Sequence, residues 1–124
     1  MSAGRILFVE DNVVCQLETS EALRRFGFDV VEVGSAAEAQ TVIEGRTPLA
    51  ALLTDVDLGA GADGYAVARR GRAAYPRLAV VYISASAGAR HAAEGVTGSE
   101  FIAKPFQSEQ VAAALERMIH VQAA

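Results

Sequence analysis

The chain of 124 residues carries a net charge of −4, with hydrophobic residues making up 52% of the sequence and charged residues 21%. This composition is typical of a globular domain and excludes an intrinsically disordered chain. The acidic balance argues against direct nucleic-acid binding, and no apolar run is long enough for a signal peptide or a membrane span. We therefore expect one cytoplasmic domain over residues 1–124, with a core of about 4–121 and no output domain.

Five apolar runs recur along the chain, and each predicts a β-strand. They cover residues 6–9, 30–33, 49–53, 78–83 and 101–103. The first, third and fourth are almost continuous hydrophobes, which is typical of strands buried on both faces of a parallel sheet. Stretches of helical length separate the runs. Strands that alternate with helices favour right-handed crossovers and an open α/β sheet that is covered on both faces.

The first predicted helix spans residues 12–26 and ends at Gly27, a residue type that readily adopts the left-handed backbone of a helix stop. Cys15 lies in this helix and is the only cysteine, which excludes an intrachain disulfide. We expect it to be a small buried or half-buried hydrophobe. The residues expected on the apolar face are Val14, Leu17, Leu23 and Phe26.

Capping signals mark the next two helices. Ser35 followed by Glu38 forms a capping box, and the helix behind it ends at Gly45. Asp63 can cap a helix from residue 64 to about 75.

The last two predicted helices differ in how many apolar residues they offer to a core. Residues 87–96 contain few large apolar groups, so this helix should be short and loosely held. The final helix runs from about residue 108 to 121. Its apolar face carries Val111, Leu115 and Met118.

Polar side chains follow four of the predicted strands. Ligands of open α/β sheets bind beyond the carboxyl ends of the strands, where the strand order reverses. The residues at these ends are Glu10 and Asp11 after the first strand, Thr54, Asp55 and Asp57 after the third, Ser84 after the fourth, and Lys104 after the fifth. We therefore expect several carboxylates, a hydroxyl and a lysine to share one pocket.

Carboxylates gathered in one pocket repel one another unless a cation joins them. An oxygen-only ligand set suits Mg²⁺, or Mn²⁺, rather than zinc. The two histidines, His91 and His120, lie away from the strand ends, and we expect both on the surface. A carboxylate beside a hard divalent ion, with a lysine and a hydroxyl nearby, is equipped to accept a phosphoryl group.

Each of these residues alone has a plainer explanation. An Asp at a strand end is more often a turn or capping residue, and Glu10 with Asp11 could simply cap the first helix. Lys104 before a proline is a common loop pattern, and Ser84 alone is uninformative. Their joint occurrence at the ends of different strands favours the shared site.

The combination resembles the receiver domain of bacterial two-component response regulators, from residue 6 to about 119. Four segments carry the resemblance: ILFVEDN (6–12), LLTDVDL (52–58), YISA (82–85) and FIAKPF (101–106). Each is weak alone, but four in this order and spacing are specific. The resemblance implies a single doubly wound (βα)5 flavodoxin-like fold, with a five-stranded parallel sheet of order 2-1-3-4-5.

The resemblance also implies a role for each residue around the acceptor. Asp55 would be the phospho-acceptor, and Lys104 would pair with a phosphoryl oxygen. Asp11 and Asp55 would bind Mg²⁺ directly, Glu10 would act through a water, and Asp57 would contribute its backbone carbonyl.

A second group of residues would respond to the phosphoryl group. The hydroxyl of Ser84 would swing toward it, and Phe101 would turn inward as Ser84 moves. The Lys104–Pro105 bond is expected to be cis. Asp57 and Ser86 are expected to tune the lifetime of the phosphoryl group.

One loop departs from the usual family pattern. Residues 58–64 are one residue longer than the commonest form, and Gly59 stands where Pro is usual. We expect this loop to be more mobile than in most relatives, which leaves one wall of the site less defined.

The implied function is that of a signalling phospho-acceptor that assists its own phosphorylation and dephosphorylation. The donor would be a phosphohistidine of a histidine kinase or histidine phosphotransfer protein. A downstream protein would read the fourth helix, fifth strand and fifth helix, with the receiver as a monomer or a phosphorylation-dependent homodimer. No nucleic-acid or membrane partner is expected.

Two alternatives remain open at this point. A pseudo-receiver would keep the fold as a binding module that is never phosphorylated. A haloacid-dehalogenase-like phosphatase is the second, because Asp55 and Asp57 after an apolar strand also match the paired aspartates of that family.

Overall fold

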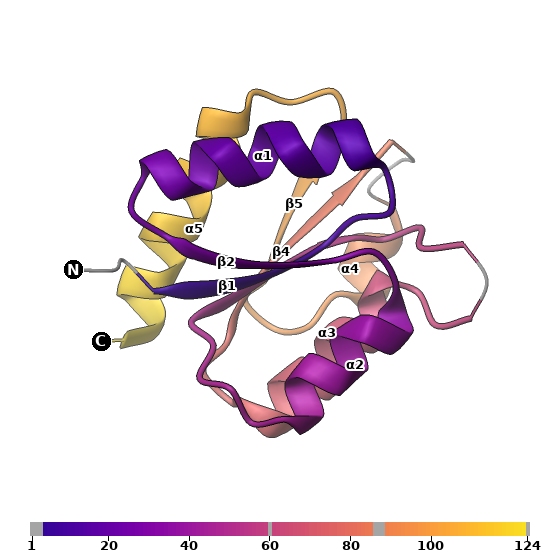
Figure 1. Ribbon diagram of the computed structural model, residues 1–124. Coiled ribbons are helices and arrows are strands. Elements are labelled where there is room, and N and C mark those ends of the chain that lie inside the picture. Colours follow the sequence, from indigo (N-terminus) through magenta and orange to yellow (C-terminus); the bar gives the residue numbers. More distant parts are fainter. Residues whose placement is uncertain (1–3, 60, 86–88, 124) are drawn as a thin grey trace.

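The computed structural model describes residues 4–59, 61–85 and 89–123, which form five strands and five helices (Figure 1). The strands are β1 (Arg5–Val9), β2 (Asp29–Val33), β3 (Ala51–Asp55), β4 (Ala79–Ser84) and β5 (Glu100–Ala103). The helices are α1 (Val13–Arg25), α2 (Ala36–Glu44), α3 (Gly64–Ala74), α4 (Ala89–Glu94) and α5 (Ser108–Ala123). All neighbouring strands are parallel in the order β2-β1-β3-β4-β5, so the predicted α/β fold and sheet order are confirmed.

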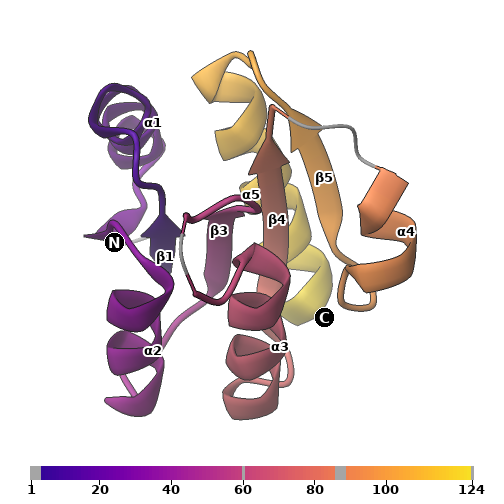
Figure 2. The same cartoon turned by 90° about the vertical axis from the view of Figure 1, so that its right-hand side faces the viewer.

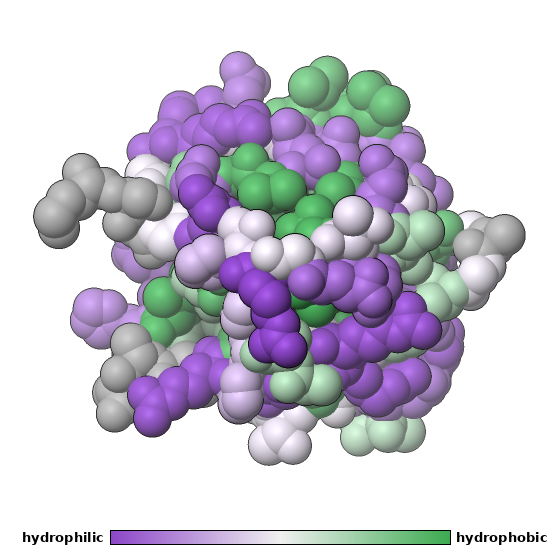
Figure 3. Space-filling model, turned by 60° about the horizontal axis from the view of Figure 1, so that its bottom comes forward, coloured by the Kyte–Doolittle hydropathy of each residue, from purple (hydrophilic) through white to green (hydrophobic). Residues whose placement is uncertain are grey.

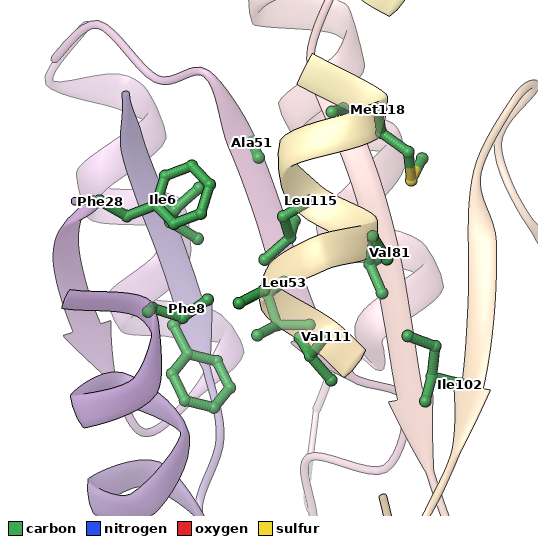
Figure 4. Close-up of a cluster of buried hydrophobic side chains, with 14 of the residues drawn as sticks. Ile6, Phe8, Phe28, Ala51, Leu53, Val81, Ile102, Val111, Leu115 and Met118 are labelled. Atoms are coloured by element: carbon green, nitrogen blue, oxygen red, sulfur yellow. The ribbon is translucent and has the colours of Figure 1, made fainter. Parts of the chain in front are cut away.

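Helices cover both faces of the sheet. α1 and α5 pack on one face, and Figure 4 shows Val111 and Leu115 of α5 among the side chains of the sheet, including Leu53 and Val81. α2 and α3 lie side by side on the other face, with α4 beside β5 (Figure 2). Because both faces are covered, every residue of β3 and β4 is buried, which explains their continuous apolar runs.

β3 begins and ends two residues later than predicted. The expected strand covered residues 49–53, whereas the observed strand is Ala51–Asp55. Its pairing with β4 explains the difference, because Asp55 pairs with Ile83 and the next residue, Val56, donates its N–H to the Ile83 carbonyl at 3.0 Å. Asp55 is therefore the last residue of a buried strand, held by the sheet itself.

The predicted apolar face of α1 is wrong for three residues. Val14 is 64% exposed, Leu17 58% and Phe26 37%, whereas Leu23 is fully buried. The other buried residues of the helix are Thr19, Ser20 and Ala22. These positions lie three and four residues apart, so they form one helix face, and their small side chains let α1 pack closely on its neighbours.

The predicted helix caps are present. The Ser35 side chain accepts from the Glu38 N–H at 3.2 Å, although the Glu38 carboxylate reaches the N–H of Gly34 rather than that of Ser35. Asp63 accepts from the third residue of α3 and caps that helix. Gly27 has a φ of 91° just beyond α1, as predicted for a left-handed stop.

The surface is mostly polar. Figure 3 shows hydrophilic residues (purple) over much of one face, with hydrophobic residues (green) in separate patches between them. Among the helices that the structure describes, none combines the length and apolar character needed to cross a membrane.

Two leucines of α1 provide a direct test of this packing. Leu23→Ala should lower the free energy of unfolding by about 2–5 kcal/mol, because it leaves a cavity in the core. Leu17→Ala, the matched control in the same helix, should change it by no more than about 0.5 kcal/mol, because Leu17 faces solvent. Urea denaturation measures both values, and equal losses would contradict the observed orientation of α1.

Candidate functional site

Lys104 lies at the centre of the site, between two buried carboxylates. Its Nζ donates to Glu10 Oε1 at 2.8 Å and to Asp55 Oδ2 at 3.0 Å. The Lys104 backbone continues the β4–β5 ladder, because its N–H donates to the Ser84 carbonyl at 2.8 Å. The Lys104–Pro105 peptide bond is cis, as the sequence resemblance implied.

Glu10 directly follows β1 and is 1% exposed. Its Oε2 accepts a hydrogen bond from the N–H of Asn12, the residue that caps α1, at 3.2 Å. Burial raises the pKa of a carboxyl group, but the hydrogen bonds from Lys104 and Asn12 outweigh it and hold the pKa of Glu10 below its ordinary value. Glu10 is therefore an ionised carboxylate that anchors the lysine.

Asp55 is 5% exposed and presents both carboxylate oxygens to donors. Oδ2 accepts from Lys104, and Oδ1 accepts from the N–H of Asp57 at 3.1 Å. Burial raises the pKa of Asp55 to about 6, and the nearby charge of Glu10 acts in the same direction, while Lys104 and the Asp57 N–H oppose the rise.

Ser84 and Asp57 form a second contact beside Asp55. Ser84 ends β4 and is buried, and its Oγ donates to Asp57 Oδ2 at 3.1 Å. Asp57 is exposed. The buried hydroxyl of Ser84 is thus paired with an exposed carboxylate two residues after Asp55.

Three carboxylates are close enough to share a metal ion. Ligand oxygens of Glu10, Asp11 and Asp55 lie within 4.8 Å of one another, and Asp11 is the exposed member of the set. All of these donors are oxygens, the ligand type that suits Mg²⁺ or Mn²⁺. Lys104 offsets part of their mutual repulsion, and a divalent cation would offset the rest, so the residues present fit such an ion.

Comparison with known proteins is decisive about the family. The sequence model of the response regulator receiver domain matches residues 6–116. This chain belongs to that family. A response regulator receiver protein from Sinorhizobium medicae WSM419 superposes with a TM-score of 0.92 at 30% identity, with 95% of each chain covered.

Two further relatives are sensor proteins or parts of them. The receiver domain of the hybrid histidine kinase CckA superposes with a TM-score of 0.79 at 27% identity, over 94% of this chain and 99% of that one. The Escherichia coli sensor protein TorS is 40% identical over 81 residues, which is 65% of this chain and 9% of TorS. The chain thus spans only a small part of this curated relative.

The structure brings the predicted residues of the receiver site together. Lys104 contacts both Glu10 and Asp55, and Asp11 lies within reach of a shared ion. Asp57 and Ser84 pair beside them. Ser86, the other residue expected to tune phosphoryl lifetime, lies outside the described residues.

The prediction that both histidines lie on the surface is wrong for His91, although His120 is exposed. The His91 ring is half-buried, 5.5 Å from the Tyr82 ring and 6.1 Å from the Phe101 ring between centroids. Gly95 makes room for it, because a Cβ there would lie 2.4 Å from His91 Cδ2. A glycine four residues after His91 was the available sequence signal.

The raised pKa of Asp55 predicts a pH-dependent stability. The folded-state value of about 6 exceeds the ordinary value of 3.8, so the folded protein binds this proton more tightly and loses stability as the pH rises through that interval. In EDTA, Asp55→Asn should therefore gain stability relative to the parent between about pH 4 and pH 7, by ~2 kcal/mol. Urea denaturation across this range measures the difference. A difference that stays constant with pH would contradict the assignment.

Proposed function

We propose that this receiver domain accepts a phosphoryl group on Asp55 from a phosphohistidine of a histidine kinase or histidine phosphotransfer protein. The observation that carries the proposal is the contact between Asp55 and Lys104. A carboxylate that ends a buried strand is held 3.0 Å from an ammonium group, with exposed Asp11 and Asp57 around it. The acceptor is fixed from behind by the sheet, and the donor approaches from solvent.

In the transfer, a carboxylate oxygen of Asp55 attacks phosphorus in line while the P–N bond to the donor histidine breaks and its electron pair returns to the imidazole. Lys104 already touches Asp55 Oδ2, so its ammonium needs only a small movement to reach a phosphoryl oxygen. Glu10 holds the lysine during that movement. Most of the rate acceleration then comes from positioning and from neutralised charge.

A magnesium ion would be held by Asp11, Asp55 and the Asp57 backbone carbonyl, with Glu10 acting through a water. When bound, it would neutralise negative charge on the transferring oxygens. The same oxygen donors also suit Mn²⁺. The three carboxylates within 4.8 Å support this assignment.

The phosphoryl group would give the Ser84 hydroxyl a new acceptor in place of Asp57. Ser84 pairs with Ala103 in the β4–β5 register, and Phe101 of the same strand lies near the ring of His91 in α4. Movement of Ser84 and an inward turn of Phe101 would therefore change how α4 packs. The proposed output is a shift in the population of two arrangements of the α4–β5–α5 face, which a downstream protein reads.

The proposal extends to the setting of the reaction. The receiver would act in the cytoplasm, where kinases are supplied with ATP, as a monomer or as a phosphorylation-dependent homodimer. Asp57 would influence how long the aspartyl phosphate lasts, because its side chain lies beside the acceptor and binds Ser84. Ser86 is proposed for the same role from the sequence alone.

Acetyl phosphate with Mg²⁺ tests the acceptor directly. The protein should gain the mass of one phosphoryl group, and the label should be absent without Mg²⁺ and in Asp55→Asn. Asp57→Asn, which changes the neighbouring carboxylate, should keep the label. Intact-protein mass spectrometry makes the measurement.

The rival functions give different outcomes in the same experiment. A protein that stays unlabelled by acetyl phosphate and by phosphohistidine donors would be a pseudo-receiver. Rapid turnover of a phosphomonoester such as p-nitrophenyl phosphate would instead favour the phosphatase.

A further inference from the structure

Arg90, in the first turn of α4, binds the residue that caps α3. Its Nη2 lies 2.9 Å from Asp63 Oδ2, and its Nε lies 2.7 Å from Glu94 Oε2. The guanidinium also lies over the ring of Tyr65, 5.1 Å from the centroid. Three contacts from two helices thus orient this side chain, and two of them are to residues at the start of α3.

Asp63 uses its two carboxylate oxygens for two different purposes. Oδ1 accepts from the N–H of Ala66 at 3.0 Å and caps α3, while Oδ2 accepts from Arg90. One side chain therefore joins the start of α3 to α4. The two helices meet at this point although Asp63 and Arg90 are 27 residues apart in sequence.

The start of α3 in turn rests on the backbone of the acceptor. Gly64, its first residue, donates its N–H to the Val56 carbonyl at 2.9 Å. A Cβ at Gly64 would lie 2.2 Å from the Asp55 carbonyl oxygen and 2.9 Å from Val56 Cα, so no side chain fits there. A displacement of the α3 N-terminus would therefore disturb the Gly64–Val56 hydrogen bond and the backbone next to Asp55.

The loop that follows Asp55 contains two glycines in the left-handed backbone region. Gly59 and Gly61 have φ values of 78° and 95°, and neither position has an atom within 4 Å of the site of a Cβ. Glycine loses more conformational freedom on folding than any other residue. Beside these glycines, Leu58 is 7% exposed and Ala62 packs on the core, while Asp63 holds the end of the loop at α3.

We propose that Arg90 is a positioning residue for the acceptor loop. By holding Asp63, Arg90 fixes the N-terminus of α3. Through Gly64, this N-terminus in turn fixes the backbone at Val56 and Asp57, on which phosphoryl acceptance depends. The contacts described above support the link between α4 and the loop. The expected effect of Arg90 on Mg²⁺ binding also rests on the proposed function. α4, which lies on the proposed output face, is thus joined to Asp55 by contacts that do not involve Ser84. A change at either end of these contacts is expected to affect the other end.

Hydrogen exchange of the Gly64 amide, followed by NMR without Mg²⁺, tests the link. Arg90→Gln should raise its exchange rate about two- to fivefold, because the contact that holds Asp63 is lost. Asp63→Asn keeps an oxygen to cap Ala66 but loses the charge that Arg90 binds, so it should have a similar effect. The double variant should exceed neither single variant, because both remove the same interaction.

Two further variants distinguish loss of the Arg90–Asp63 contact from a general destabilisation of α4. Glu94→Gln removes the other carboxylate partner of Arg90 and should leave Gly64 exchange at the parent rate. Arg90→Lys keeps a positive charge and should recover part of the protection. The proposal is overturned if Gly64 exchange in Arg90→Gln equals that of the parent, if Glu94→Gln has the same effect as Arg90→Gln, or if the effects of Arg90→Gln and Asp63→Asn add.

Calorimetric titration with Mg²⁺ connects the link to the site. The dissociation constant should rise about two- to fivefold in Arg90→Gln and stay unchanged in Arg117→Gln, which breaks an ion pair with Glu100 elsewhere on the surface. An unchanged Mg²⁺ affinity in Arg90→Gln would overturn the positioning role. If the parent itself binds no Mg²⁺, the proposed function fails, while Gly64 exchange still decides whether Arg90 holds the loop.

Discussion

The ammonium group of Lys104 is held between Glu10 and Asp55, two almost fully buried carboxylates that come from neighbouring strands. Two buried negative charges in one small site are unfavourable without such a cation. The sheet order makes the contact possible, because β1 and β3 are neighbours and the side chain of Lys104, which directly follows β5, extends past the end of β4 to both carboxylates. Burial and the charge of Glu10 nevertheless keep the pKa of Asp55 raised to about 6, so an additional cation at the site would stabilise the ionised carboxylate.

Under the proposed function, two sets of contacts would connect the site with the face formed by α4. One route leads from Ser84 along the paired strands β4 and β5 to Phe101 and His91. The other leads from the Asp55 backbone through Gly64 and Asp63 to Arg90. Both routes end on α4, a helix of six residues. A short helix with few large apolar groups is easily moved, which suits an element that responds to a change at the site.

The strand ends of the site are predictable from the sequence because the reactive residues directly follow apolar runs. Charged and hydroxyl residues directly after apolar runs marked the strand ends, and the ladder of a parallel sheet then brought Glu10, Asp55 and Lys104 together. The boundary of β3 was misplaced because Leu49 is apolar yet packs on the core from the preceding loop. The face of α1 was misjudged because small residues, including Thr19, form its buried side. The contact of Arg90 with Asp63 depends on how α3 and α4 lie relative to each other, which no local pattern contains.

The central claim is that Lys104 and Asp55 form a site ready to receive a phosphoryl group. A crystal structure of the protein with Mg²⁺ and beryllofluoride, which mimics the aspartyl phosphate, tests it most directly. We predict beryllofluoride on an oxygen of Asp55, Lys104 Nζ and Ser84 Oγ bonded to its fluorines, and Mg²⁺ on Asp11, Asp55 and the Asp57 carbonyl. A structure in which beryllofluoride is absent from Asp55, or in which Ser84 still binds Asp57 while Lys104 contacts no fluorine, would contradict the account.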